Sequence, residues 1–336
     1  TTYFSALLLL LLSLICLGSW ANTFKRAGTR WRFELFSFDF AIGAILLALI
    51  AAFTFGTLGS DLTFSDRLLV AGRAAQVWLI AAGVVFNLGN MLLIAATSLL
   101  GMSIAFPMSI GLALIEVSFF HFNAHNVFFL VGGIIFMTAA VLLDGMASQF
   151  RDLSAAKPPK TTHRSPHVRK MRKTTKGLIV ALMSGILLGL FYPLAAKGMS
   201  GDLGVGPYGG ALLFSVGILL STPVYNLYFM NMAIEGGPIS FNAYFTGRPQ
   251  QHFLGFVGGA LWILGALAAL LAAASSQTGL ALSVILPLAS VILAIFWGTL
   301  TWKELSAAPK NAKLSIGLTA VFFICALICF GAGVAR

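Results

Sequence analysis

Long apolar runs recur along the whole chain, and short polar or Gly- and Pro-containing stretches separate them. An α-helix rises about 1.5 Å per residue, so about 20 apolar residues cross a hydrocarbon core of about 30 Å. The runs are continuous rather than alternating, which favours helices over membrane β-strands. The pattern predicts ten membrane-spanning helices, at residues 3–22, 36–57, 74–97, 101–122, 126–147, 176–197, 209–231, 251–273, 277–300 and 313–334.

Composition agrees with this pattern. Hydrophobic residues make up 59% of the chain and charged residues 9%, against about 25% charged residues in soluble domains. The first apolar run has no basic segment before it and no small-residue cleavage site, so we interpret it as a spanning helix rather than a signal peptide. We therefore predict an all-α polytopic membrane protein with ten transmembrane helices.

Positive charge is concentrated in one segment. Residues 147–176 hold nine of the 21 Lys and Arg residues and are rich in Pro and Ser, which is typical of a flexible linker. This segment, taken as a linker over 148–175, should attract anionic lipid headgroups rather than nucleic acid. Counted by loop, 17 Lys and Arg fall on one side of the membrane and four on the other. The positive-inside rule then places the linker in the cytoplasm and both termini outside. We expect an integral protein of the bacterial inner (plasma) membrane.

The linker divides the predicted helices into two sets of five, residues 1–147 and 176–336. An odd number per half means that equivalent helices run in opposite directions. The halves also match locally, since Trp20 aligns with Phe191 when LGSWANTFKRAG (17–28) is placed over LGLFYPLAAKG (188–198). Two inverted five-helix repeats are a design that transporters use, with the substrate site near the midplane.

Five segments carry a resemblance to a known family: GSWANTFKRAGTRWRFELFSFDFAIG (18–43), VVFNLGNMLLIAATSLLGMSIAFPMSIGLAL (84–114), TPVYNLYFMNMAIEGGPISFNAY (222–244), QHFLGFVGGALWILG (251–265) and FWGTLTWKEL (296–305). The chain resembles the drug/metabolite transporter superfamily, in the branch that holds the bacterial glucose and rhamnose porters and the plant ureide permeases. The resemblance implies ten helices, alternating access and a small polar solute. It leaves sugar, ureide, nucleobase and drug substrates open.

We predict secondary active transport of such a solute, with proton coupling as one possibility. Two alternatives stay open: an exporter of drugs or metabolites, and a membrane assembly subunit that keeps the fold without transporting. The oligomeric state stays open as well.

Polar side chains inside the apolar runs are the candidate site, because a polar group in lipid must find a partner or line a cavity. Asn87 and Asn90 are three residues apart and so share a helix face. Their amides suit a neutral solute, or they join helices. Trp20 and Asn22 lie at the inner end of the first span, where Trp20 could instead be an interfacial anchor. Tyr192 precedes Pro193, which is expected to break or kink its helix.

Further along the chain, Tyr225 and Asn226 follow Pro223 and pair an aromatic ring with an amide, as a planar or pyranose solute requires. Trp262 lies mid-span and is the expected stacking platform, although it could be simply packed or lipid-facing. These residues complete the predicted substrate site: Trp20, Asn22, Asn87, Asn90, Tyr192, Tyr225, Asn226 and Trp262.

Glu116 is an acid within the fourth predicted span. Together with Ala105, Ser109 and Ala113 it forms a stripe of small and polar residues that should face the bundle. A carboxyl group there could exchange a proton, so we predict that Glu116 couples transport to protons. In the alternative interpretation it is a helix-end carboxylate in an outer aqueous vestibule. Glu34 and Asp39 are read as acids at the positive N-terminus of the second helix.

No spacing assembles a catalytic triad, and no Cys or His pattern fits a metal site. The three cysteines lie in apolar runs and are expected to be core residues. The chain is therefore not expected to be an enzyme or to carry a metal or cofactor.

Overall fold

The computed structural model describes residues 3–58, 63–121, 126–155, 172–201, 204–274 and 286–334. Nine helices in these ranges are long and apolar enough to span a membrane, and no strand occurs in them. A shorter apolar helical segment covers Leu286–Thr301. The polytopic helical membrane protein predicted from the sequence is thus confirmed.

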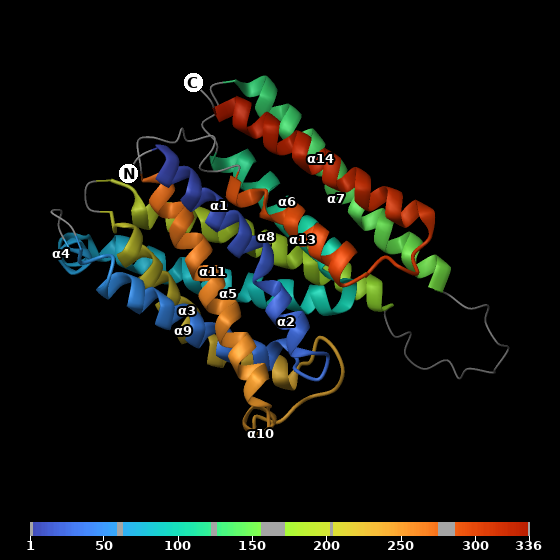
Figure 1. The fold of residues 1–336 in the computed structure, drawn as a ribbon, viewed down its shortest axis with the longest axis horizontal. Coiled ribbons are helices and arrows are strands. Elements are labelled where there is room, and N and C mark those ends of the chain that lie inside the picture. The colour runs from blue at the N-terminus through green and yellow to red at the C-terminus, as the bar shows by residue number, and fades with distance from the viewer. Residues whose placement is uncertain are drawn as a thin grey trace.

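The helices before the linker are α1 (Tyr3–Ser19), α2 (Ala21–Ala27), α3 (Phe33–Phe53), α4 (Phe64–Val70), α5 (Arg73–Leu100), α6 (Met102–His121) and α7 (Val127–Ala155). Those after it are α8 (Lys173–Met199), α9 (Pro207–Asn231), α10 (Asn242–Phe245), α11 (Pro249–Ala273), α13 (Ser290–Phe296), the π-helix η1 (Trp297–Thr301) and α14 (Lys310–Val334) (Figure 1).

Nine of the predicted spans correspond to these helices, eight of them within about five residues at each end, whereas α7 extends eight residues beyond the predicted 126–147. The span predicted at 277–300 begins outside the described residues, so the tenth full crossing stays a prediction. Helix also occupies both ends of the segment taken as a linker, because α7 continues to Ala155 and α8 begins at Lys173. Residues 156–171 lie outside the described residues.

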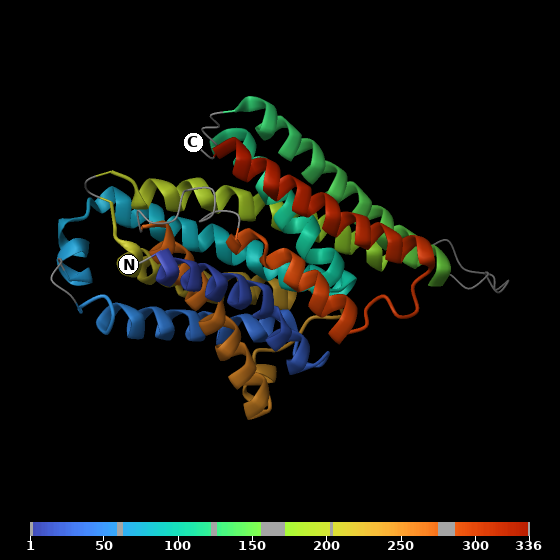
Figure 2. The ribbon, with the colours of Figure 1, turned by 45° about the horizontal axis from the view of Figure 1, so that its top comes forward.

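The helices pack mainly across the two halves of the chain. In one group, α1 and α3 pack on α11, and α1 also contacts α13. In the other, α5 packs on α8 and α9, and α8 also contacts α6. Contacts between α3 and α9 join the two groups, and α7 pairs with α14 along one side of the molecule (Figures 1 and 2).

Glycines allow two of these helix pairs to touch backbone to backbone. A Cβ atom added at Gly43 of α3 would lie 1.9 Å from the carbonyl oxygen of Phe256 on α11, and one added at Gly259 of α11 would lie 1.9 Å from the Phe40 oxygen. The α5–α9 crossing repeats this arrangement, because Gly83 and Gly217 each leave 2.1 Å to a carbonyl oxygen of the partner helix. Small residues at helix crossings permit this approach in membranes.

Candidate functional site

A cavity of about 190 Å³ lies between helices of both halves. Its walls come from α1, α5, α6, α8 and α11, and from the segment that leads into α13. The residues that line it are Leu17, Trp20, Phe86, Asn90, Leu93, Phe106, Ile110, Ala113, Leu114, Val117, Leu188, Phe191, Tyr192, Trp262, Pro287, Leu288 and Ser290. Most of the lining is therefore aliphatic or aromatic.

Four of the residues predicted to bind substrate line this cavity: Trp20, Asn90, Tyr192 and Trp262. Asn90 is 2% exposed, and its amide makes no hydrogen bond to any described residue. A buried amide without a partner costs free energy, so this group is available to a ligand. Tyr192 is 44% exposed and lies at the edge of the cavity.

Aromatic rings line the same cavity as the Asn90 amide. The Trp262 ring lies 4.2 Å from Phe86, centroid to centroid, and 5.5 Å from Phe214, with which it is nearly parallel at 13°. On another wall, Trp20 lies 6.0 Å from Phe106. Stacked and tilted contacts between the rings hold them in fixed orientations. They present flat apolar surfaces to whatever occupies the cavity.

Two other predicted residues hold the structure together outside the cavity. The Asn87 amide donates to Ser221 Oγ (2.9 Å), Thr222 Oγ1 (3.0 Å) and the Ile218 carbonyl (3.2 Å) on α9. Asn22 accepts a hydrogen bond from Trp302 Nε1 at 2.6 Å. Asn87 therefore joins α5 to α9, and Asn22 joins α2 to the segment after η1.

Tyr225 and Asn226 of α9 also lie outside the cavity lining. Asn226 is fully buried, and neither atom of its amide has a hydrogen-bond partner in the part of the chain that the structure describes. The structure thus does not bring Tyr225 and Asn226 together with Asn90 and Trp262.

Glu116 packs against α8. Its carboxylate lies beside Gly189, where an added Cβ would be 2.2 Å from Oε2. Ser109 on the same stripe donates a hydrogen bond to the Ala181 carbonyl of α8 at 2.9 Å. Residues Ala113, Leu114 and Val117 of α6 line the cavity, whereas Glu116 does not. Proton coupling by Glu116 stays a prediction.

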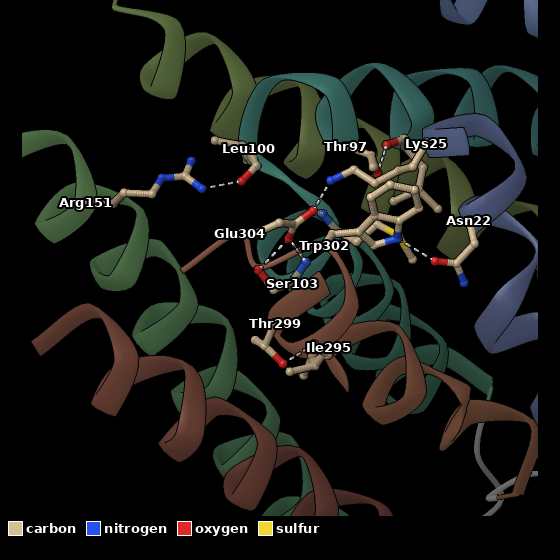
Figure 3. A network of polar contacts seen from close by, with 12 residues as sticks. Asn22, Lys25, Thr97, Leu100, Ser103, Arg151, Ile295, Thr299, Trp302 and Glu304 are labelled. Carbon is tan, nitrogen blue, oxygen red and sulfur yellow. Dashed lines mark hydrogen bonds and ion pairs between the residues drawn. The ribbon is translucent and has the colours of Figure 1, made fainter. Parts of the chain in front are cut away.

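A polar network around Glu304 lies at the end of the bundle predicted to be cytoplasmic (Figure 3). Glu304 forms an ion pair with Lys25 and accepts hydrogen bonds from the backbone N–H groups of Met102 (2.8 Å) and Ser103 (2.9 Å) and from Ser103 Oγ (2.8 Å). It therefore caps the N-terminus of α6, which is a favourable place for a negative charge. Burial disfavours the charged form, but Lys25 and these N–H donors outweigh it and hold the pKa of Glu304 below its ordinary value.

Sequence reasoning missed several of these residues. Phe86 is four residues before Asn90 on the same helix face, so helical periodicity could have assigned it to the cavity. No local pattern links Glu304 to α6. Asp144 was also passed over: it is fully buried in α7, and both carboxylate oxygens lack a hydrogen-bond partner among the described residues.

Comparison with known proteins adds a functional class. No protein-family model matches the chain. Ureide permease 2 of Arabidopsis thaliana is 25% identical over 389 aligned positions, which cover 96% of this chain and 95% of that protein. Ureide permease 4 of the same plant is 25% identical over 384 positions, which cover 93% of each. A solved crystal structure of a protein aligns with a TM-score of 0.51 at 15% identity, covering 96% of this chain and 97% of that one, and this likeness concerns the fold alone.

The similarity to permeases extends over nearly the whole chain and includes the helices that form the cavity. It suggests transport of a small solute rather than catalysis. The chain is an integral membrane protein, and its full-length similarity to two ureide permeases supports its membership of a transporter family.

Proposed function

We propose that this protein is a secondary active transporter of a small, uncharged, planar solute of the ureide or nucleobase type. The observation that carries the proposal is the unpaired Asn90 amide in a cavity whose lining includes several aromatic rings. An amide offers both a donor and an acceptor to a cyclic amide or urea, and flat rings favour a planar ligand.

The lining of the cavity favours this class over sugars. Asn90, Tyr192 and Ser290 are the polar residues among its lining residues. A sugar with several hydroxyl groups would leave most of them without partners against the remaining walls, which is costly. The volume of about 190 Å³ also lies below that of drug-sized pockets, which begin at about 300 Å³. A small solute therefore fits better than a bulky drug.

The helix packing supports the finer parts of the proposal, namely two inverted repeats within the drug/metabolite transporter fold. If the second half repeats the first, Gly43 is equivalent to Gly217, and Gly83 to Gly259. These four glycines make the two closest helix crossings, α3 with α11 and α5 with α9. The pairings of α1 with α11 and of α5 with α8 are related in the same way.

Alternating access requires that one end of the cavity be closed while the other opens. The Glu304 network supports a closed cytoplasmic end, because it ties α2 and the segment after η1 to the first turn of α6. We infer that these contacts break when the cavity opens to that side. The proposed orientation, with both termini outside, follows the positive-inside count.

Uptake into proteoliposomes tests the proposed function. Purified protein should exchange internal unlabelled uracil or allantoin for the labelled compound with saturable kinetics. Labelled glucose should not exchange. Saturable exchange of glucose without exchange of either heterocycle would contradict the proposed substrate class. No saturable exchange of any of these solutes would contradict transport itself.

Asn90 and Asn87 should give opposite results when each is replaced by alanine. Asn90→Ala removes the free cavity amide, so we expect KM for the exchanged heterocycle to rise about tenfold, from the loss of about 1–1.5 kcal/mol of hydrogen bonding. Its unfolding temperature should stay near that of the wild type, since this amide makes no bond to a described residue. Asn87→Ala removes hydrogen bonds to α9 and should lower the unfolding temperature with little change in KM.

A further inference from the structure

A second polar cluster joins α3, α10 and α11 at the end of the bundle predicted to be cytoplasmic. Asp39 of α3 is 5% exposed. Its carboxylate accepts a hydrogen bond from Tyr244 Oη at 2.6 Å, and His252 Nδ1 lies 3.0 Å from Oδ1 and 3.1 Å from Oδ2. Asp39 is the seventh residue of α3, beyond the first turn in which a helix dipole acts. A specific pairing with His252 therefore explains this acid better than the dipole predicted from the sequence.

A polar pocket lies next to the histidine, which is not itself one of its lining residues. A cavity of about 680 Å³ is lined by Trp31, Gly247, Arg248 and Gln251, among other residues. His252 Nε2 faces Gly247, since a Cβ atom added there would lie 2.7 Å from it. The His252 side chain is 29% exposed and that of Asp39 is 6% exposed. One ring nitrogen thus faces the buried carboxylate, and the other faces the wall of the pocket.

We propose that Asp39 and His252 form the proton-binding site of the transporter, with His252 Nε2 as the atom that takes up the proton. This proposal rests on the proposed transport function. Neutral His252 donates its Nδ1 hydrogen to Asp39, which leaves the Nε2 lone pair open to a proton from the solvent beside the pocket, because the side chain is 29% exposed. Protonation gives an imidazolium next to the Asp39 carboxylate, and this charge pair offsets the cost of placing the cation in a partly buried site. Release returns the proton from Nε2 to that solvent.

The neighbouring groups suit this role. Tyr244 donates to Asp39, and burial together with the hydrogen bond to Asp39 and the charge of that carboxylate raises the pKa of Tyr244, so it remains a donor. Glu34, one turn before Asp39, is already paired with Arg32. Arg30 and Arg248 line the pocket, and their positive charges oppose a further cation, so the imidazolium needs a negative partner. Asp39 is therefore the carboxylate available to the imidazolium within this cluster.

The position of the cluster connects it to the transport cavity. His252 and the cavity residue Trp262 lie on the same helix, α11, ten residues or about 15 Å apart. The backbone contacts at Gly43 and Gly259 fix α11 against α3, the helix that carries Asp39. When the protonation of the Asp39–His252 pair changes, we therefore expect α11 to shift as a rigid helix, because its close packing leaves no room for a local adjustment.

Tryptophan fluorescence tests proton binding without any substrate. The Trp31 and His252 rings lie 4.7 Å apart in an edge-on arrangement, and a protonated imidazole quenches a nearby indole. The difference in emission between wild-type protein and Trp31→Phe should therefore fall on acidification as the proton binds. His252→Gln should abolish this pH-dependent component. A component that persists in His252→Gln, or that is absent from the wild type, would overturn the proposal.

Proteoliposome assays then separate proton coupling from transport itself. With labelled uracil as the probe, His252→Gln and Asp39→Asn should keep solute exchange at equal pH but lose the acceleration produced by a pH gradient. Glu116→Gln tests the proton-coupling role predicted for Glu116 from the sequence, which this proposal replaces, and should keep that acceleration. Loss of acceleration in Glu116→Gln, with acceleration intact in His252→Gln, would overturn the proposal. If wild-type protein exchanges no solute, the transport function fails, and the fluorescence titration still decides proton binding.

Discussion

Replacing Gly259 by alanine should destabilise the protein by about 3 kcal/mol, although the same change usually stabilises a helix by about 0.5–1 kcal/mol. The reason is the α3–α11 crossing, where the new methyl group would lie 1.9 Å from the Phe40 carbonyl oxygen. That atom belongs to a helix backbone and cannot move aside as a flexible side chain would. The helices must separate, and the contacts along both of them weaken.

Gly317→Ala provides the matched control. Gly317 lies within α14, and nothing in the described structure comes within 4 Å of a Cβ atom added there. This variant should unfold at the same temperature as the wild type or slightly above it. Thermal unfolding in detergent, followed by size-exclusion chromatography, compares the two. Equal unfolding temperatures for Gly259→Ala and Gly317→Ala would show that the crossing can open at no cost.

Replacing Glu304 by alanine should cost about 3–5 kcal/mol, the usual result of breaking a buried ion pair by removing one partner. The Glu304 side chain is 7% exposed, and its loss leaves Lys25 and the N–H groups of Met102 and Ser103 without their acceptor. Glu304→Gln keeps an acceptor oxygen but removes the charge, so it should be less destabilising than Glu304→Ala. Unfolding temperatures of the three proteins at pH 7 provide the measurement.

The pH dependence of stability gives a second readout of Glu304. Its pKa is held below the ordinary value, despite burial, by Lys25 and the N–H donors of α6. A carboxylate with a lowered pKa stabilises the folded state above its unfolded pKa of about 4.3. That contribution is lost as the pH falls through the lowered folded value. The wild type should therefore lose stability on acidification below about pH 5, and Glu304→Gln should lose less. Identical pH profiles would mean that the ion pair contributes nothing.

The sequence predicts the helices well because lipid imposes a single rule on every span. Hydrogen bonds must be satisfied within the helix and the side chains must be apolar, and both requirements are visible in a local window. Substrate binding by the predicted site residues stays a prediction, but four of them line one cavity. Trp20, Asn90, Tyr192 and Trp262 were chosen as bulky or polar residues inside spans.

Other predictions depend on distant contacts that no local pattern contains. Asn87 and Asn90 differ by about 60° around the helix, and only packing decides that Asn87 faces α9 while Asn90 faces the cavity. Glu304 caps a helix 202 residues earlier in the chain, and Asp39 pairs with a histidine 213 residues away. A sequence shows that such residues are polar. It does not show which distant group is their partner.

The dominance of packing between the halves has a consequence for biosynthesis. During synthesis the first half enters the membrane before α8, α9 and α11 exist, although these are the helices on which α5 and α3 pack. Until those helices are made, the helix faces that carry Gly43 and Gly83 lack their partner helices. The Asn87 amide also lacks its hydrogen-bond acceptors on α9. Long-range contacts of this kind slow folding and prolong the exposure of unpaired surfaces. A nascent chain stalled after α7 is therefore the form of this protein most exposed to membrane quality control.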